Sequence, residues 1–411
     1  MRLPHIIENV KEEYITLPAL KSFVKANGIP APKESESSNA NKGAYINAVS
    51  CFADKNSENQ ENVLNWIDSV VKEGIKEIQI ENVPLKPEME LLFTNKSSVQ
   101  RHLESYLAGK NHHLAGNTYG NEYDLVRYDL INDVHGKCIA LLFCRGMRYY
   151  DAKTGYSGNV EYPIFVDYYY ERGWLMIRYK SRSGLYDLMP EETTLEELLR
   201  HSISLNKEIK KIYNRTECIL SFDIMDINSA SNVLREKFYR VLDRYTQTPS
   251  EIVEVIKNNQ SGMKAVTMAI MQMCSLPEQF QRKVETDIQN LIEKYLSITW
   301  PDKSVFSHDR DAYPIRLSAT DEEESKVDQS SATSNEPLQS KEVFFDNKRM
   351  LESQRQCDNL TLIWKRTSRI YYSESTFPVR LSEKGGKCTL SFKKYVAEED
   401  ILNVLFALIE A

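Results

Sequence analysis

Acidic and basic side chains in the middle of the sequence are of the types that a metal-dependent nuclease needs. Such an enzyme holds a metal ion with carboxylates and orients the attacking water with a lysine on an adjacent strand. Asp167 and Lys180 lie in two consecutive apolar and aromatic segments that should form neighbouring strands. However, Arg178 stands two residues before the lysine, where a second metal-binding acid is needed. The nuclease set is therefore incomplete at this place.

The remaining candidates for catalysis have simpler structural explanations. Asp223 and Asp226 could share a metal, but their spacing also suits a turn and a cap before a helix. His112 and His113 lie in a polar loop without acids or cysteines at ligand spacing, and the stretch 308–311 is also typical of a loop. Motifs of the HEXXH, GXSXG and phosphate-loop types are absent. We predict no catalytic residue, no metal site and no cofactor, and keep a nuclease with a dispersed active site as an alternative.

Basic residues are concentrated in the C-terminal part of the sequence. Between positions 341 and 396 they outnumber acidic residues two to one, whereas residues 1–60 carry equal numbers of both. The segment WKRTSRIYY alternates cations with aromatic side chains, as do surfaces that bind a nucleic-acid backbone and stack on its bases. A solvated strand face with its cations turned to water is the alternative. The predicted nucleic-acid contacts of this tail are Trp364, Lys365, Arg366, Arg369, Lys393 and Lys394.

Two short helices are predicted near the beginning of the sequence. Apolar residues recur at helical spacing from Leu17 to Val24, and Gly28 with the two prolines that follow should end this helix. After a polar stretch, a second helix is expected to begin at Asn41 and to present an apolar face up to Phe52. We expect the two helices to pack on each other.

The helix pair, LPALKSFVKANGI followed by NKGAYINAVSCF, resembles the SAP and helix-extended-loop-helix families. The resemblance implies DNA binding with little sequence preference, and Lys21, Lys25 and Lys42 are then the cations available for phosphates. It covers about a tenth of the chain, and the loop is several residues longer than is usual in those families. Because this module is neutral, we expect Lys365, Arg366 and Arg369 to contribute more affinity than its three lysines.

The pattern of the remaining segments predicts an α+β fold. Four apolar-aromatic segments separated by glycine- and asparagine-bearing turns are typical of an antiparallel meander between Tyr123 and Asp187, and a helical block should follow from Ser229 to Leu296. A capping box at Thr193 should open a further helix. Other expected strands are 75–83, 217–224, 360–364, 378–381 and 387–392, with a last helix at 398–409.

Composition divides the chain into four parts. We predict a SAP-like helical module at 1–55, a central α+β domain at 61–317, a linker at 318–340 and a basic β/α segment at 341–411. The linker is expected to be disordered because it contains almost no large apolar residue. The last segment is short for an independent fold, so it is expected either to stand alone or to dock on residues 313–317 and complete the central sheet.

Charge and cysteine usage limit the class of protein. The net charge of −7 does not favour a general nucleic-acid binder, and the seven cysteines are scattered without a CxxC pair. No signal peptide and no apolar run near the ~18 residues that span a bilayer are present, so we expect a cytoplasmic protein. We predict a non-enzymatic DNA-binding or DNA-sensing protein. Proteins with a similar domain plan suggest, by association, an accessory factor of bacterial DNA maintenance or anti-phage defence. The alternative is an assembly subunit that contacts a protein partner, or itself, through its tyrosine-rich sheet.

Overall fold

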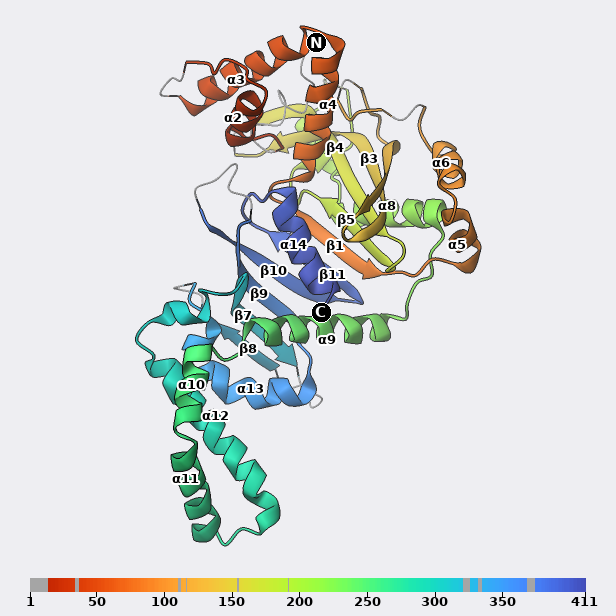
Figure 1. The fold of residues 1–411 in the computed structure, drawn as a ribbon. Coiled ribbons are helices and arrows are strands. Elements are labelled where there is room, and N and C mark those ends of the chain that lie inside the picture. The colour runs from red at the N-terminus through yellow and green to blue at the C-terminus, as the bar shows by residue number, and fades with distance from the viewer. Residues whose placement is uncertain are drawn as a thin grey trace. The chain divides into compact units, whose positions relative to one another are not determined.

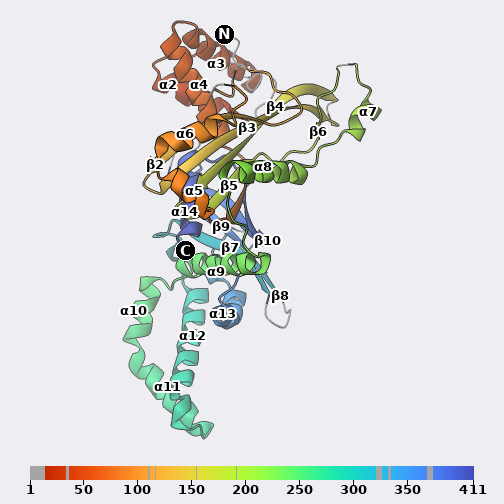
Figure 2. The same ribbon diagram turned by 90° about the vertical axis from the view of Figure 1, so that its right-hand side faces the viewer.

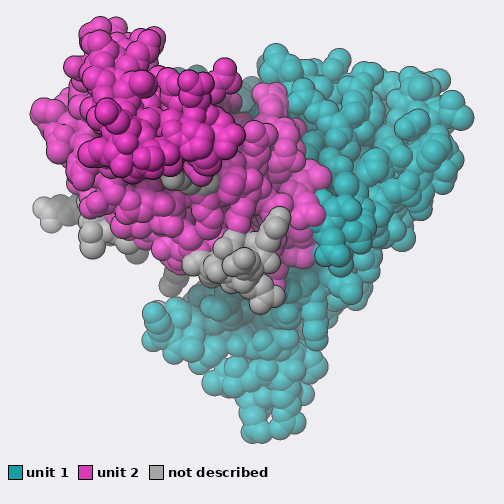
Figure 3. Space-filling model, turned by 90° about the horizontal axis from the view of Figure 1, so that it is seen from below, with its two compact units in different colours: residues 1–230, 367–375, 387–406 teal, residues 231–366, 376–386, 407–411 magenta. Residues whose placement is uncertain are grey.

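The protein has the predicted α+β fold, with helices packed on antiparallel sheet. The computed structural model describes residues 14–33, 37–109, 112–115, 117–153, 155–190, 192–320, 326–331, 335–367 and 374–411. Contacts divide the chain into two compact units, coloured in Figure 3. Unit 1 comprises residues 1–230, 367–375 and 387–406, and unit 2 comprises residues 231–366, 376–386 and 407–411. No helix in the described part of the chain is long and apolar enough to cross a membrane.

Unit 1 is built on antiparallel strands in the order β2-β3-β4-β5-β1-β11 (Figure 1). The strands are β1 (Glu77–Asn82), β2 (Asp124–Asp133), β3 (Gly136–Asp151), β4 (Tyr156–Tyr169), β5 (Trp174–Tyr179) and β11 (Lys387–Phe392), with the short β6 (Leu185–Tyr186) paired to β3. The predicted meander is confirmed, and in its clearest hairpin Tyr169 pairs with Trp174. Gly173 has a φ of +69° in the turn of this hairpin, a conformation that favours glycine.

Helices cover both faces of the unit 1 sheet (Figure 2). The helices of this unit are α2 (Leu17–Ala26), α3 (Ser38–Ala53), α4 (Ser57–Lys72), α5 (Pro87–Phe93), α6 (Lys96–Glu104), α7 (Leu195–Arg200), α8 (Leu205–Leu220) and most of α14 (Glu398–Ile409). Lys72 of α4 reaches Asp167, whereas Tyr213 of α8 and Tyr168 both contact the ring of Phe222. Consecutive strand residues point to opposite faces, so α4 and α8 lie on opposite sides of β4.

The predicted helix pair is confirmed, although α3 begins at Ser38 instead of Asn41 because Ser37 caps it. Leu20 of α2 is fully buried in the same core as the apolar face of α3. The ring of Phe23 lies 6.1 Å from that of Phe52 in α3 and 4.4 Å from that of Trp66 in α4, measured between centroids. The two helices therefore share their core with a third helix and belong to unit 1, so the predicted boundary after residue 55 is not where the chain divides.

Two predicted elements between residues 193 and 224 are wrong. The single helix expected from Thr193 is two helices, α7 and α8, and Thr194 is the residue that caps the first. In place of the strand expected at 217–224, residues 217–220 form the last turn of α8, which ends where Ser221 takes a left-handed conformation with φ of 46°. Beyond it, only Phe222 forms an isolated antiparallel bridge, with Leu85. The buried apolar face of α8, which includes Ile209 and Ile212, continues into residues 217–220. Burial of this face in the core overrides the local β preference of these residues.

Unit 2 contains strands in the order β10-β9-β7-β8. Its elements are β7 (Ala312–Thr320), β8 (Lys326–Ser330), β9 (Asn359–Lys365), β10 (Thr376–Lys384), α9 (Ile227–Tyr245), α10 (Ser250–Asn258), α11 (Gln260–Met273), α12 (Gln281–Thr299) and α13 (Glu342–Gln354). Within this unit, α11 and α12 form a pair that extends away from the strands (Figures 1 and 2). The pairing of Tyr313 with Ile363 confirms that the last segment docks on residues 313–317.

The linker predicted at 318–340 is wrong for its described residues. Residues up to 320 belong to β7, and β8 pairs with them from Lys326 onward. Gln329 is 4% exposed and donates a hydrogen bond of 3.0 Å to the carbonyl of Val343, and Leu338 is also buried. Backbone pairing and buried polar contacts therefore hold a segment whose composition is poor in apolar residues.

Candidate functional site

Two residues predicted for the tail surface, one aromatic and one basic, are buried. Trp364 is 4% exposed and packs edge-on against Tyr245, with 5.4 Å between ring centroids, so its ring is not available to stack on a base. Arg366 is buried, and its guanidinium lies 5.1 Å from the ring of Phe377. The alternation in WKRTSRIYY gave a wrong prediction of exposure for these two residues, because β9 is buried on both faces near its end.

The other described tail cations are divided between the two compact units. Lys365 is exposed and donates to the carbonyl of His308, within unit 2. Lys393 and Lys394 belong to unit 1, and Lys394 pairs with Glu374 at 2.7 Å. Arg369 lies outside the described residues. Each unit therefore carries only part of the predicted tail surface.

In the helix pair, only some of the predicted cations face water. Lys25 is exposed at the end of α2, and Lys21 is half-buried with its ammonium 5.8 Å from the centre of the Tyr45 ring. Lys42 is 8% exposed, so it is wrongly placed among the phosphate contacts. Lys33, which the sequence analysis did not single out, is exposed on the extended segment between the helices.

A buried group of charges replaces the nuclease set considered from the sequence. Asp167 is 2% exposed and accepts from Lys72 at 3.0 Å and from Arg178 at 2.9 Å. Arg178 is 1% exposed and also pairs with Glu398 at the start of α14. Burial alone would raise the pKa of Asp167, but the two cations outweigh burial and hold that pKa below its usual value. We conclude that these residues fasten α4 and α14 to the sheet.

Within the described ranges, no group of three or more histidine, cysteine or acidic side chains is suited to a metal ion. On the opposite face of the sheet, Arg145 is 1% exposed and pairs with Glu208 of α8 at 2.7 Å and with Asp187 at 2.6 Å. These contacts satisfy the buried guanidinium and position α8, so their role is structural.

Glu73, the residue that follows α4, is a carboxyl group whose protonation should affect stability. The Tyr395 hydroxyl donates to it at 3.0 Å and the Glu398 N–H at 3.3 Å. Burial nevertheless raises the pKa of Glu73 to about 7. Between pH 4.5, its unperturbed value, and pH 7 the folded protein keeps a proton that the unfolded chain has released, so stability should fall as pH rises.

We therefore expect Glu73→Gln to reduce the pH dependence of unfolding. Raising the pH from 5 to 8 should cost the wild type up to about 3 kcal/mol more than the variant, since one pKa unit corresponds to about 1.4 kcal/mol. Urea unfolding at both pH values measures this difference. Glu122→Gln, at an exposed loop position, is the matched control and should behave like the wild type. Equal pH dependence in all three proteins would contradict the raised pKa.

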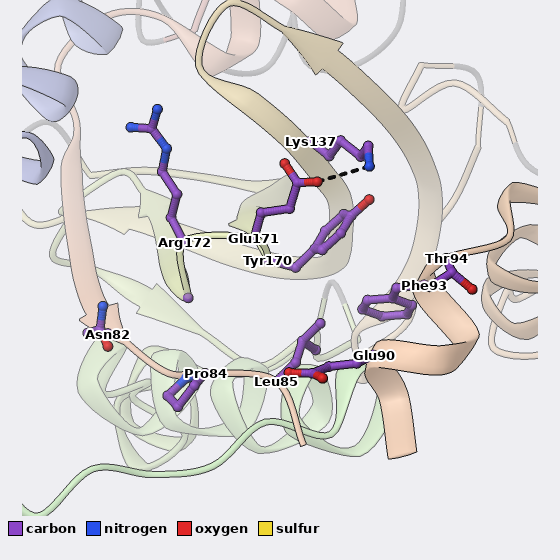
Figure 4. Close-up of a pocket in the computed structure, with 11 residues that line it drawn as sticks. Asn82, Pro84, Leu85, Glu90, Phe93, Thr94, Lys137, Tyr170, Glu171 and Arg172 are labelled. Atoms are coloured by element: carbon purple, nitrogen blue, oxygen red, sulfur yellow. Dashed lines mark ion pairs between the residues drawn. The ribbon is translucent and has the colours of Figure 1, made fainter. Parts of the chain in front are cut away.

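Unit 1 carries a hollow between the α5 helix and the β4–β5 turn, which we call the Phe93 cleft (Figure 4). Its volume is about 490 Å³. The rings of Phe93 and Tyr170 meet edge to face with 5.2 Å between centroids, and Lys137 pairs with Glu171 at 2.9 Å (Figure 4). Arg172 extends along the other side. The lining combines these aromatic rings with charged and polar side chains, so it could contact a ligand that is partly apolar and partly charged.

Two smaller hollows lie beside the end of β2. The first, which we call the Val99 pocket, has a volume of about 250 Å³ and shares Phe93 and Tyr170 with the Phe93 cleft. The second, the α4 cleft, has a volume of about 430 Å³ and lies between α4 and the face of β2, β3 and β4 that carries Phe165. Both hollows are lined by Leu130 and Ile131.

An ion cluster at one end of the α4 cleft involves His113, which lies in the loop that the sequence predicts to be polar. His113 Nδ1 lies 2.7 Å from Asp68, and its Nε2 lies 3.0 Å from Glu61. Arg127 of β2 also contacts Asp68 at 2.8 Å. Asp68 is 45 positions from His113, so spacing along the sequence carried no signal of this contact.

Comparison with protein-family models and with curated proteins gives no match to this chain. The candidate sites are therefore judged by their geometry. Exposed lysines flank the extended segment of the helix pair, and two hollows flank the end of β2.

Proposed function

We propose that the protein is a non-enzymatic DNA-binding protein that contacts phosphates through α2, α3 and the segment between them. The observation that carries this proposal is the packed helix pair, which carries exposed Lys25 in the last turn of α2 and exposed Lys33 in the described stretch that follows α2. Its arrangement agrees with the resemblance to SAP-like modules. Phosphate contacts of this kind depend on charge and carry no sequence information, so low sequence preference is expected.

The start of α3 adds a second favourable feature. This helix is 16 residues long and has no acidic residue in its first turn, so none of the side chains of that turn neutralises the positive end of its dipole. Ser37 accepts a hydrogen bond from the backbone of Ala40, while other N–H groups of the first turn have no partner within the helix. Such a helix start attracts anions.

Because Trp364 and Arg366 are buried, we assign the proposed DNA contacts to the helix pair instead of the tail. Few cations are available there, so binding should be weak and its dependence on salt shallow. Non-specific complexes typically have Kd values on the order of 10⁻⁴ to 10⁻⁶ M at physiological salt. We expect the protein to lie in this range on duplexes of unrelated sequence.

The test is a salt titration of duplex binding by the wild type and the double variant Lys25→Ala/Lys33→Ala. Each phosphate-contacting cation contributes about 0.9 to the slope of log K against log salt, so the variant slope should be smaller by roughly two. Fluorescence anisotropy with a labelled duplex measures both affinity and slope.

The matched control is Lys264→Ala/Lys283→Ala, which removes two exposed lysines from α11 and α12 in unit 2. This control should keep the wild-type slope. The proposal fails if the wild type shows no salt-dependent binding, or if the Lys25/Lys33 variant and the control have the same slope.

A further inference from the structure

The outer side of β2 is an open edge of the unit 1 sheet. β2 pairs with β3, and no strand of the described part of the chain pairs with its other side. The first residues of that side are covered, because Ala108 donates to the carbonyl of Leu125 and His112 donates to that of Val126. Among the described residues, none makes such a backbone contact with the stretch from Leu130 to Asp133. Every second residue of this stretch therefore presents backbone donor and acceptor groups outward.

The open stretch has a hollow on each face of the sheet. Leu130 and its partner Ile139 face the Val99 pocket, while Asp129 and its partner Ala140 face the α4 cleft. Ile131, 37% exposed, lies at the rim of both. An added strand would place alternate side chains on the two faces, which is where these hollows lie.

We propose that the β2 edge binds an extended segment of a partner polypeptide, which adds to the sheet as a further strand. In this mode backbone hydrogen bonds supply affinity, and pockets for alternate side chains supply specificity. The inference is independent of the proposed DNA binding, because it uses neither the helix pair nor its lysines.

The two faces define the chemistry of the segment. Phe93, Val99 and Ile139 line the Val99 pocket together with polar residues that include the cations Lys96 and Lys137. The residue opposite Leu130 should therefore be apolar, because a basic one would be repelled. Asp133 is exposed three positions further along, so a basic residue opposite it would be favoured. The segment should therefore carry an apolar and a basic side chain three positions apart.

Charge also argues against a second copy of this chain at the edge. If two copies of β2 paired antiparallel about Ile131, Asp129 of each copy would lie directly opposite Asp133 of the other. Like charges directly opposite one another destabilise a strand pair. A basic partner segment has no such conflict.

The probes are two labelled hexapeptides, Thr-Leu-Thr-Thr-Lys-Thr and Thr-Lys-Thr-Thr-Leu-Thr, which present the same side chains in parallel and antiparallel pairing. Versions with alternate backbone nitrogens methylated are the matched controls, because they keep the side chains but lose the donors that an added strand needs. We expect at least one unmethylated peptide to bind to the full-length protein at least tenfold more tightly than its methylated version. Hydrogen exchange should slow at residues 130–133.

Protein variants locate the site. Ile131→Lys adds charge at the shared rim and should weaken binding at least tenfold, with unfolding checked to be unchanged. Val134→Lys, at a residue 92% exposed that lines neither hollow, should bind like the wild type. Equal binding of methylated and unmethylated peptides, or no effect of Ile131→Lys, would overturn the proposal. Self-association that Ile131→Lys abolishes, without peptide binding, would also overturn it and assign the edge to a second copy.

Discussion

Replacing Arg178 by methionine should lower the free energy of unfolding by about 3–5 kcal/mol, the usual cost of removing one partner of a buried ion pair. Arg178 and Asp167 are 1% and 2% exposed and lie 2.9 Å apart. The variant leaves the Asp167 carboxylate buried with Lys72 as its remaining cation, at 3.0 Å. It also leaves Glu398, the first residue of α14, without the cation with which it pairs. Urea unfolding at pH 7 measures the loss.

The matched control is Arg200→Met, which breaks an ion pair with Glu196 on the surface of α7. The two side chains of that pair are 72% and 83% exposed, so its loss should cost less than about 1 kcal/mol. A second variant, Arg178→Met/Asp167→Leu, removes both buried charges and should recover part of the lost stability. If Arg178→Met cost no more than Arg200→Met, the buried cluster would not be holding the sheet and helices together.

Leu20→Ala should cost about 2–5 kcal/mol, as is usual for leucine truncation in a packed core. Leu20 is fully buried where α2 meets the core of unit 1. The lost methyl groups would leave a cavity that the aromatic contacts of Phe23 with α3 and α4 prevent from collapsing. Thermal and urea unfolding both report the change.

Leu91→Ala is the control for this truncation, because Leu91 is 78% exposed on α5. Its substitution should change stability by less than about 0.5 kcal/mol. A similar small effect at Leu20 would mean that the helix pair does not unfold together with the rest of unit 1, which would contradict the shared core.

Local patterns in the sequence predicted the regular parts of the fold well. The alternation of apolar and polar residues around Ile78 and the turns between Tyr123 and Asp187 are properties of short segments, and both produced the expected strands. The pairing of β7 with β9 was also among the alternatives considered. Failures occurred where distant residues decide the structure. Residues 217–220 are helical because α8 buries one continuous face, and β8 is ordered because β7 supplies its backbone partners.

Surface exposure was the property that sequence predicted least well. Trp364 and Arg366 are of residue types that often contact nucleic acids, yet packing around β9 buries both. Lys42 is buried in the same way in α3. Conversely, the hollows beside Leu130 and Ile131 combine residues from α4, α5, α6 and three strands. No spacing along the chain brings such residues together, so these hollows required the three-dimensional structure.

The position of β11 has a consequence for synthesis of the protein on the ribosome. β1 lies between β5 and β11, and Ile80 of β1 pairs with Cys388, about 300 residues later in the chain. During translation one side of β1 must stay unpaired until almost the entire described chain has been made. An unpaired edge in the middle of an apolar sheet favours aggregation, so the nascent chain should depend on chaperones until residues 387–392 emerge. Ribosomes that stall before this strand should release chains that cannot complete unit 1.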